Sequence, residues 1–208
     1  MKLFIGLVVL TLGVGFGTSA VSAQDKMKDD KMMKDDKMMK DDKMMSNDGN
    51  PMVGGAAMFK TKNIVENAVN SADHTTLVAA VKAAGLVDTL MSAGPFTVFA
   101  PVNSAFDKLP AGTVNTLLKP ENKATLTKVL TYHVVAGNMD STAIAAAIKK
   151  GKGKAKFKTV AGRTLTAKME GTTLVLTDEK GGKSRVTIAD VRQSNGVIHV
   201  VDSVLLPK

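Results

Sequence analysis

The sequence predicts an α+β fold, with helices in the first half of one globular domain and an antiparallel sheet in the second. Between residues 63 and 132, apolar residues recur mainly at spacings of three and four, the period of helices buried on one face. Between residues 164 and 207, short alternating or apolar runs are separated by turns rich in glycine. Helices followed by meandering strands favour an α+β architecture.

The chain begins with a segment that is typical of a secretory signal peptide at residues 1–23. A basic start at Lys2 precedes the apolar run from Leu3 to Gly17, and small residues at 21–23 offer a cleavage site before Gln24. The run is too short for a membrane span, so we expect an exported protein, periplasmic or extracellular, without a transmembrane anchor. Because the 208 residues include no cysteine, an exported domain must rely on its core for stability.

Residues 24–57 are expected to form a disordered tail and linker. From Asp25 to Met45 the motif Lys-Met-Met-Lys-Asp-Asp repeats, with seven lysines and seven aspartates that cancel in charge. Such a segment buries too little apolar surface to offset its ordering entropy, so a spacer is the expected role. The alternative is an envelope metal- or oxidant-buffering protein, because thioether sulfur favours Cu(I). The candidate ligands for this alternative are Met32, Met33, Met38, Met39, Met44 and Met45.

Residues 58–208 are long enough for one domain with a single good core. Asn63 is placed to cap a short helix over 64–69, and a second helix over 77–84 ends at Gly85. A third short helix over 86–91 follows.

A buried strand over 96–101 comes next, with proline on both sides. Asn103 and Ser104 are expected to cap one turn of helix, and Thr113 another. Pro120 opens the helix that follows.

The stretch Leu130–Gly137 joins that helix to a strand that starts at Val134. It holds Tyr132, the only tyrosine, next to His133, one of three histidines. Such a pair is either a hydrogen-bonded brace or a catalytic or ligand pair. A buried tyrosine or histidine needs partners in any case, so the residues alone favour the structural interpretation.

The second half reads as one capped helix and then strands. Asp140-Ser141 caps a helix over 142–150, whose last-turn lysines suit the helix dipole. Alternating or apolar runs and intervening turns predict strands around 165–169, 174–176 and 186–188. Ser194-Asn195-Gly196 is a strong hairpin signal and leads into a final apolar strand over 197–207.

Three stretches resemble the signatures of the fasciclin-like domain family: Thr-Val-Phe-Ala-Pro-Val-Asn-Ser-Ala-Phe at 97–106, Thr-Tyr-His-Val-Val at 131–135, and the stretch over 195–207. Two entry stretches, 62–67 and 73–77, match as well, and Val102 stands where the family commonly has threonine. The resemblance implies a β-wedge of two roughly perpendicular sheets with helices packed around it, and a secreted or surface-attached adhesion module. It also implies a structural motif, with His133 buried near Asn103. The motif residues are Asn103, Tyr132, His133, His199 and Asp202.

No metal-binding or nucleophile motif is present in the sequence, so we expect neither an enzyme nor a cofactor. His74, His133 and His199 are far apart in the chain, which is more typical of separate structural residues than of a ligand set. His199 and Asp202 would lie on opposite faces of an extended strand.

A lysine-rich segment after the capped helix is the remaining candidate site. It lacks acidic residues and is expected to be an adaptable loop, either solubilising or in contact with a cell-surface or matrix component such as an anionic polysaccharide. Only Phe157 is available there for stacking on bases, which disfavours a specific nucleic-acid partner. Nothing in the pattern indicates an oligomeric state. The six lysines are Lys149, Lys150, Lys152, Lys154, Lys156 and Lys158.

Overall fold

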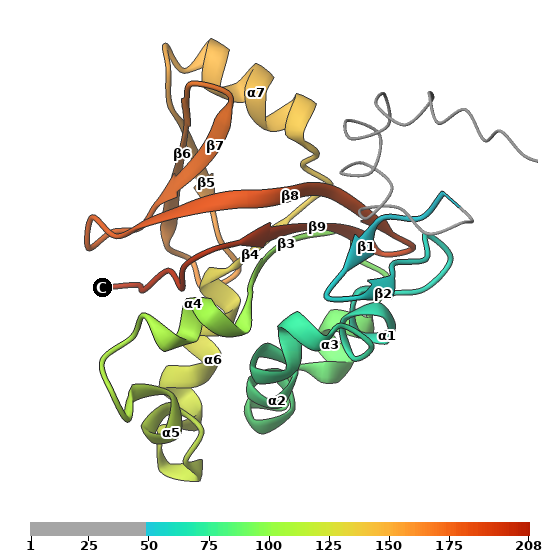
Figure 1. Cartoon of the computed structure of the whole chain (residues 1–208). Coiled ribbons are helices and arrows are strands. Elements are labelled where there is room, and N and C mark those ends of the chain that lie inside the picture. Colours follow the sequence, from blue (N-terminus) through green and yellow to red (C-terminus); the bar gives the residue numbers. More distant parts are fainter. Residues whose placement is uncertain (1–48) are drawn as a thin grey trace, which may run out of the picture. The chain divides into compact units, whose positions relative to one another are not determined.

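The computed structural model describes residues 49–208 of the 208-residue chain, so the expected signal peptide and the methionine repeat lie outside the described residues. The expected α+β class is confirmed: a seven-stranded sheet in the order β4-β3-β9-β8-β7-β6-β5 is packed with helices (Figure 1). Its strands are β3 (Phe96–Pro101), β4 (Val134–Ala136), β5 (Ala155–Lys158), β6 (Thr164–Glu170), β7 (Thr173–Thr177), β8 (Lys183–Gln193) and β9 (Gly196–Val201).

The long strand β8 joins the two halves of the wedge. It pairs with β7 over residues 183–185 and with β9 over residues 186–193, with register shifts on either side of Ile188. Irregularities of this kind bend a strand and increase its twist. The sheet therefore folds at β8, and Figure 1 shows β5, β6 and β7 running across the direction of β3 and β9.

Strands β3 and β9 are parallel, whereas the sequence predicted only antiparallel pairing. Phe96 lies opposite Gly196 and Pro101 opposite Val201 along the whole of both strands. Parallel neighbours need a long crossover connection, and the helices and strands between residues 102 and 195 provide it. The strand alternation alone did not reveal this pairing.

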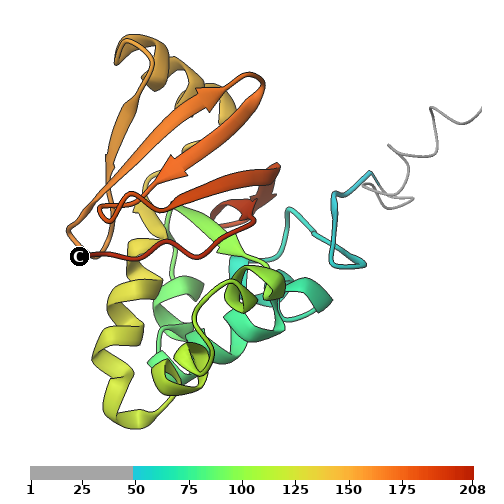
Figure 2. The ribbon, with the colours of Figure 1, turned by 60° about the vertical axis from the view of Figure 1, so that its left-hand side comes forward.

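The helices lie in two groups. Those before β4 gather on one side of β3 and β9 (Figure 2). Their apolar residues and those of the two strands form one core, which includes Ile64, Leu77, Leu90, Val98 and Ile198. Helix α7 covers the other half, where a second core contains buried residues of α7, β6 and β7. The helical segments are α1 (Ile64–Ala68), η2 (Ala72–His74), α2 (Thr75–Ala84), α3 (Val87–Met91), α4 (Asn103–Asp107), α5 (Thr113–Leu117), η3 (Pro120–Asn122), α6 (Lys123–Tyr132) and α7 (Ser141–Lys150).

Most helix ends follow the sequence signals. Asn63 forms a capping box with Glu66, Gly85 ends α2 with φ 72°, and Asp140 caps α7 by accepting from the Ala143 N–H at 2.9 Å. The expected cap at Thr113 is wrong. Helix α5 already begins at that residue, after Gly112 at φ 80°, and no side chain caps it.

The ordered fold begins before residue 58, the boundary expected from composition. Strands β1 (Met52–Val53) and β2 (Ala56–Ala57) form a small antiparallel hairpin. Val53 is only 3% exposed and belongs to the helical core, and the Gly54 carbonyl accepts from the Ala72 N–H. This segment therefore packs against the domain and is not a free linker.

The last strand is shorter than expected. β9 ends at Val201, and residues 202–208 continue as ordered chain without strand pairing. Leu205 is fully buried, and the Leu206 N–H donates to Asp178 Oδ2 at 2.9 Å. Within residues 49–208, no helix combines the length and apolarity needed to cross a membrane.

Candidate functional site

His133 lies at the junction of α6 and β4 and is 3% exposed. Its Nδ1 lies 2.8 Å from the Val129 carbonyl oxygen and its Nε2 lies 3.0 Å from the Leu205 nitrogen. The imidazole therefore donates from Nδ1 and accepts at Nε2, which defines the neutral tautomer. Burial lowers the pKa of His133 to about 4, against the smaller opposing influence of its bond to Val129 and of the Asp178 charge.

Tyr132 is fully buried beside it and belongs to the second core, with residues of α7, β6 and β7. Its hydroxyl donates to the Thr164 carbonyl at 2.9 Å and accepts from the Glu179 N–H at 3.2 Å. Burial raises the pKa of Tyr132 to about 12. One side chain thus ties α6 to the start of β6 and to the turn after β7.

The sequence predicted that Asn103 or Ser104 caps α4, and this prediction is wrong. Val102 occupies the N-cap position and makes no side-chain hydrogen bond there. Asn103 Oδ1 instead accepts from the Thr76 N–H at 3.0 Å and from the Thr75 hydroxyl, while its Nδ2 donates to the Ala72 carbonyl. It therefore fixes the start of α2. The expected proximity of Asn103 to His133 is not found among these contacts; His133 is joined to the first signature stretch through the Phe99 N–H, which donates to its carbonyl at 2.9 Å.

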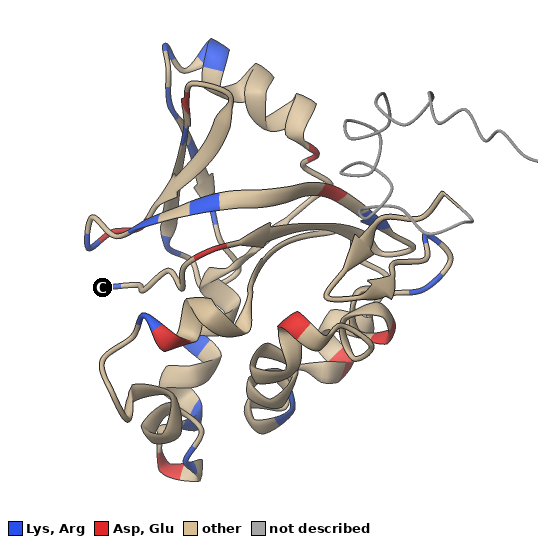
Figure 3. Ribbon diagram, in the orientation of Figure 1, with Lys and Arg blue, Asp and Glu red and all other residues tan. Residues whose placement is uncertain are grey.

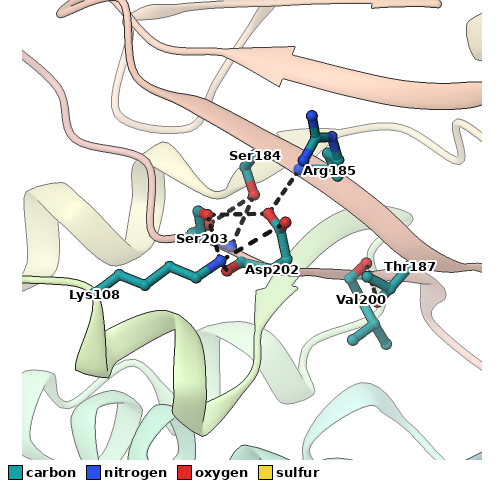
Figure 4. A network of polar contacts seen from close by, with 7 residues as sticks. All are labelled: Lys108, Ser184, Arg185, Thr187, Val200, Asp202 and Ser203. Carbon is teal, nitrogen blue, oxygen red and sulfur yellow. Dashed lines mark hydrogen bonds and ion pairs between the residues drawn. The ribbon is translucent and has the colours of Figure 1, made fainter. Parts of the chain in front are cut away.

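His199 and Asp202 are not brought together. His199 is buried in β9, stacks on Phe99 at a centroid distance of 5.6 Å and lies 2.9 Å from the Met139 carbonyl through Nε2. Burial lowers its pKa. Asp202 lies in a separate network (Figure 4), where its carboxylate accepts from the Arg185 N–H at 2.9 Å and faces Lys108 Nζ at 3.7 Å.

The third histidine, His74, is also isolated. Its Nδ1 is 2.9 Å from the Ser71 hydroxyl, and burial lowers its pKa. Across residues 49–208 there is no group of three or more His, Asp or Glu side chains placed to hold a metal ion. The candidate methionines of the repeat lie outside the described residues.

The six lysines of the candidate site are all exposed but do not form the expected adaptable loop. Lys149 and Lys150 end α7, Lys152 lies in the turn that follows at φ 53°, and Lys156 and Lys158 belong to strand β5. The sequence contained the signal, because Lys154, Lys156 and Lys158 alternate with apolar residues at the period of a strand.

Strand register places the last two of these lysines on a common face with other basic residues. Lys156 lies opposite Thr166, which lies opposite Thr177, which lies opposite Lys183. The adjacent row is Lys168, Val175 and Arg185. Directly opposed residues of antiparallel strands project to the same side of a sheet. We define the basic sheet face as Lys156, Lys158, Lys168, Lys183 and Arg185.

The basic sheet face is built on paired strands and is only partly neutralised. Val175 lies between Lys168 and Arg185 and is 1% exposed, as expected when their aliphatic stems cover it. Glu170 is the acidic neighbour, with Lys168 Nζ at 2.6 Å and Lys183 Nζ at 3.2 Å. Hydrogen bonds from these two lysines hold its pKa below the ordinary value. Figure 3 shows basic residues on β5 and β8 with few acidic ones between them.

Comparison with known proteins decides the family. A family model described as the fasciclin domain matches residues 72–207. The chain belongs to the fasciclin domain family. This fasciclin domain is similar to Protein sll1483 of Synechocystis sp., with 49% identity over 156 residues, 75% of this chain and 79% of the relative. It is also similar to Immunogenic protein MPB70 of Mycobacterium bovis, with 37% identity over 145 residues, 67% of this chain and 66% of the relative.

A solved structure supports the fasciclin fold. The FAS1 domain pair from the insect cell adhesion molecule Fasciclin I aligns with a TM-score of 0.62 and 18% identity, over 70% of this chain and 51% of that chain. The chain thus spans about half of that solved chain, and the likeness shows the wedge fold expected from the sequence.

The three signature stretches of the fasciclin domain are neighbours in space. The first contains most of β3, the second contains the end of α6 and the start of β4, and the third contains β9. The strand order β4-β3-β9 places them side by side in one sheet. The residues of these stretches are therefore mostly taken up by internal bonds, and the exposed basic sheet face lies outside them.

Proposed function

We propose that this protein is a non-enzymatic, exported fasciclin adhesion module whose basic sheet face holds an acidic polysaccharide of the envelope or matrix. Residues 1–23 serve as the signal peptide, and the methionine repeat serves as a spacer before the domain. The adhesion role follows the solved relative, which is described as a cell adhesion molecule. The acidic polymer is the partner that fits the chemistry of the exposed face.

The observation that carries the proposal is the ordered array of charges. Strand neighbours lie about 4.8 Å apart, so Lys156 and Lys183, separated by two strands, are held about 14 Å from each other. Threonine hydroxyls at 166 and 177 lie between them as additional hydrogen-bond donors. A row of exposed cationic side chains across several strands suits an extended anionic polymer better than a small ligand, with modest affinity that salt weakens steeply.

The test compares two variants that lose the same charge. One carries Lys156→Gln, Lys158→Gln and Arg185→Gln on the basic sheet face; the other carries Lys150→Gln, Lys152→Gln and Lys154→Gln, exposed lysines at the end of α7 and in the turn after it. Retention on immobilised acidic polysaccharide is measured across a salt gradient for wild type and both variants. The sheet-face variant should elute at clearly lower salt than the other. Exposed charges contribute little to folding, so both should keep the wild-type melting temperature.

Two results would contradict the proposal. Equal retention of all three proteins would leave these residues as solubilising surface. Equal loss in both variants would show attraction to net charge without a role for the strand register.

A further inference from the structure

A groove opens where β7 and β8 separate. The two strands pair only over residues 183–185 of β8, after which β8 turns toward β9, and α7 lies over the gap (Figure 1). Side chains of α7, of the β6–β7 hairpin and of β8 line this open groove, which has a volume of about 540 Å³. This volume is in the range of sites that bind small molecules.

Neutral groups line this groove. Thr142 from α7 and Thr172 from the turn of the hairpin carry hydroxyls that have no hydrogen-bond partner within the described part of the chain. Met169, which is 41% exposed, and Val186 supply apolar surface beside them. A hydroxyl both donates and accepts, so the two threonines can match a ligand that is itself covered with hydroxyls.

Lys149 lies on the face of α7 that borders the groove. Thr142, Ala145 and Lys149 follow the i, i+3, i+7 spacing, so they share one face of α7. Thr142 and Ala145 line the groove, and Lys149 is exposed about one helical turn further along. Basic residues at that end of α7 are visible in Figure 3.

We propose that the groove is a saccharide subsite for the acidic polysaccharide assigned to the basic sheet face, and the inference rests on that proposed partner. The threonine hydroxyls bind the hydroxyls of a short run of sugar rings, and the apolar side chains contact their C–H faces. Lys149 meets an anionic substituent of the sugar at the end of the groove. The lysines of the sheet would then supply salt-sensitive attraction, and the groove would supply contacts that depend on the sugar itself.

The experiment separates these two contributions with a pair of probes. Trigalacturonate carries carboxylates, and its fully methyl-esterified form has the same sugar chain without charge. Each is titrated into the ¹⁵N-labelled chain at low and at high salt. Amides of 141–145, 172–174 and 186–189 should shift with both probes, and the ester should shift them equally at both salt concentrations.

Matched variants test the hydroxyls. Thr142→Val with Thr172→Val keeps the shape of both side chains and removes both hydroxyls, and should weaken binding of the ester by about tenfold. Ala145→Leu fills the groove and should have the same effect. Thr89→Val, an exposed threonine on α3, is the control and should bind like wild type. Unchanged amide positions outside the groove establish that each variant is folded.

Failure of the subsite differs from failure of the proposed function. If the ester shifts no groove amide, or if the groove variants bind it like wild type, the subsite is overturned even where the sheet-face variant loses column retention. If the column experiment fails while the ester still shifts the groove amides, the polyanion function falls and the sugar contact stands.

Discussion

The Nε2 atom of His133 accepts a hydrogen bond from the Leu205 backbone N–H at 3.0 Å, across 72 residues of sequence. This bond attaches the C-terminal segment, which has no strand pairing of its own, to the end of α6. The neighbouring Leu206 N–H is held by Asp178, so two side chains from other elements replace the missing sheet ladder. The Tyr-His stretch therefore joins helix, sheet and chain terminus.

Replacing His133 with alanine should lower the free energy of unfolding by about 1–3 kcal/mol, because the buried Leu205 N–H and Val129 carbonyl lose their partner. Urea unfolding of wild type and His133→Ala measures this difference. Lys60→Ala, at an exposed position, is a control that should change little. An unchanged unfolding midpoint in His133→Ala would show that the histidine does not brace the fold.

The same histidine should make stability depend on pH. Its pKa is about 4 in the fold and 6.5 when unperturbed, so between these values the unfolded chain binds more protons. Its contribution is therefore complete above pH 6.5 and is lost as the pH falls toward 4, by an amount on the order of 3 kcal/mol. His74 and His199 act in the same direction, since burial lowers their pKa values too.

Unfolding free energies measured at pH 7.5, 6 and 5 should decline across the series. This range lies above the ordinary pKa values of carboxyl groups, so it isolates the histidines. In His133→Ala the decline should be shallower. A stability that is flat over this range would contradict neutral, buried histidines.

Tyr132 should resist ionisation in the folded protein. Burial raises its pKa to about 12, whereas a tyrosine in an unfolded chain has a pKa near 10. The chain has one tyrosine and no tryptophan, so the absorbance change of tyrosinate reports this residue alone. A titration should show the change near pH 12 under native conditions and near pH 10 in concentrated urea. A native transition near pH 10 would place the hydroxyl in solvent.

The sequence predicted the fold class and most helix ends because those depend on local signals. The capping box at Asn63 and the left-handed Gly85 are examples, since each can be read within a few residues. The parallel pairing of β3 with β9 depends on a contact across about 100 residues, which no local pattern encodes. For that reason the wedge was predicted from the family resemblance and could not be predicted from the periodicity.

The sequence predicted which lysines belong to the candidate site but not how they are arranged in the fold. The lysines of the segment over 149–158 were expected to share one loop, yet β5 pairs with β6 and divides them between the end of a helix and the face of a sheet. The basic sheet face became visible only when register placed Lys156 in line with Lys183. The groove depends on where β8 leaves β7, which the bend in β8 sets and composition does not reveal.

Substitutions at Asn103 and Ser104 test whether Asn103 stabilises its own helix, as the sequence predicted, or the start of α2, as the structure shows. The sequence favoured Asn103 and Ser104 equally as caps of α4, but the Asn103 amide bonds to Thr75, Thr76 and Ala72 at the start of α2. Asn103→Ala should therefore lower the free energy of unfolding by about 1–2 kcal/mol, the usual cost of a lost helix cap. Ser104→Ala, at an exposed position without such bonds, should cost less than about 0.5 kcal/mol. Chemical denaturation of both variants measures the contrast. Equal effects would mean that Asn103 acts only within α4, whereas a loss confined to Asn103→Ala would show that it stabilises α2 from a different element.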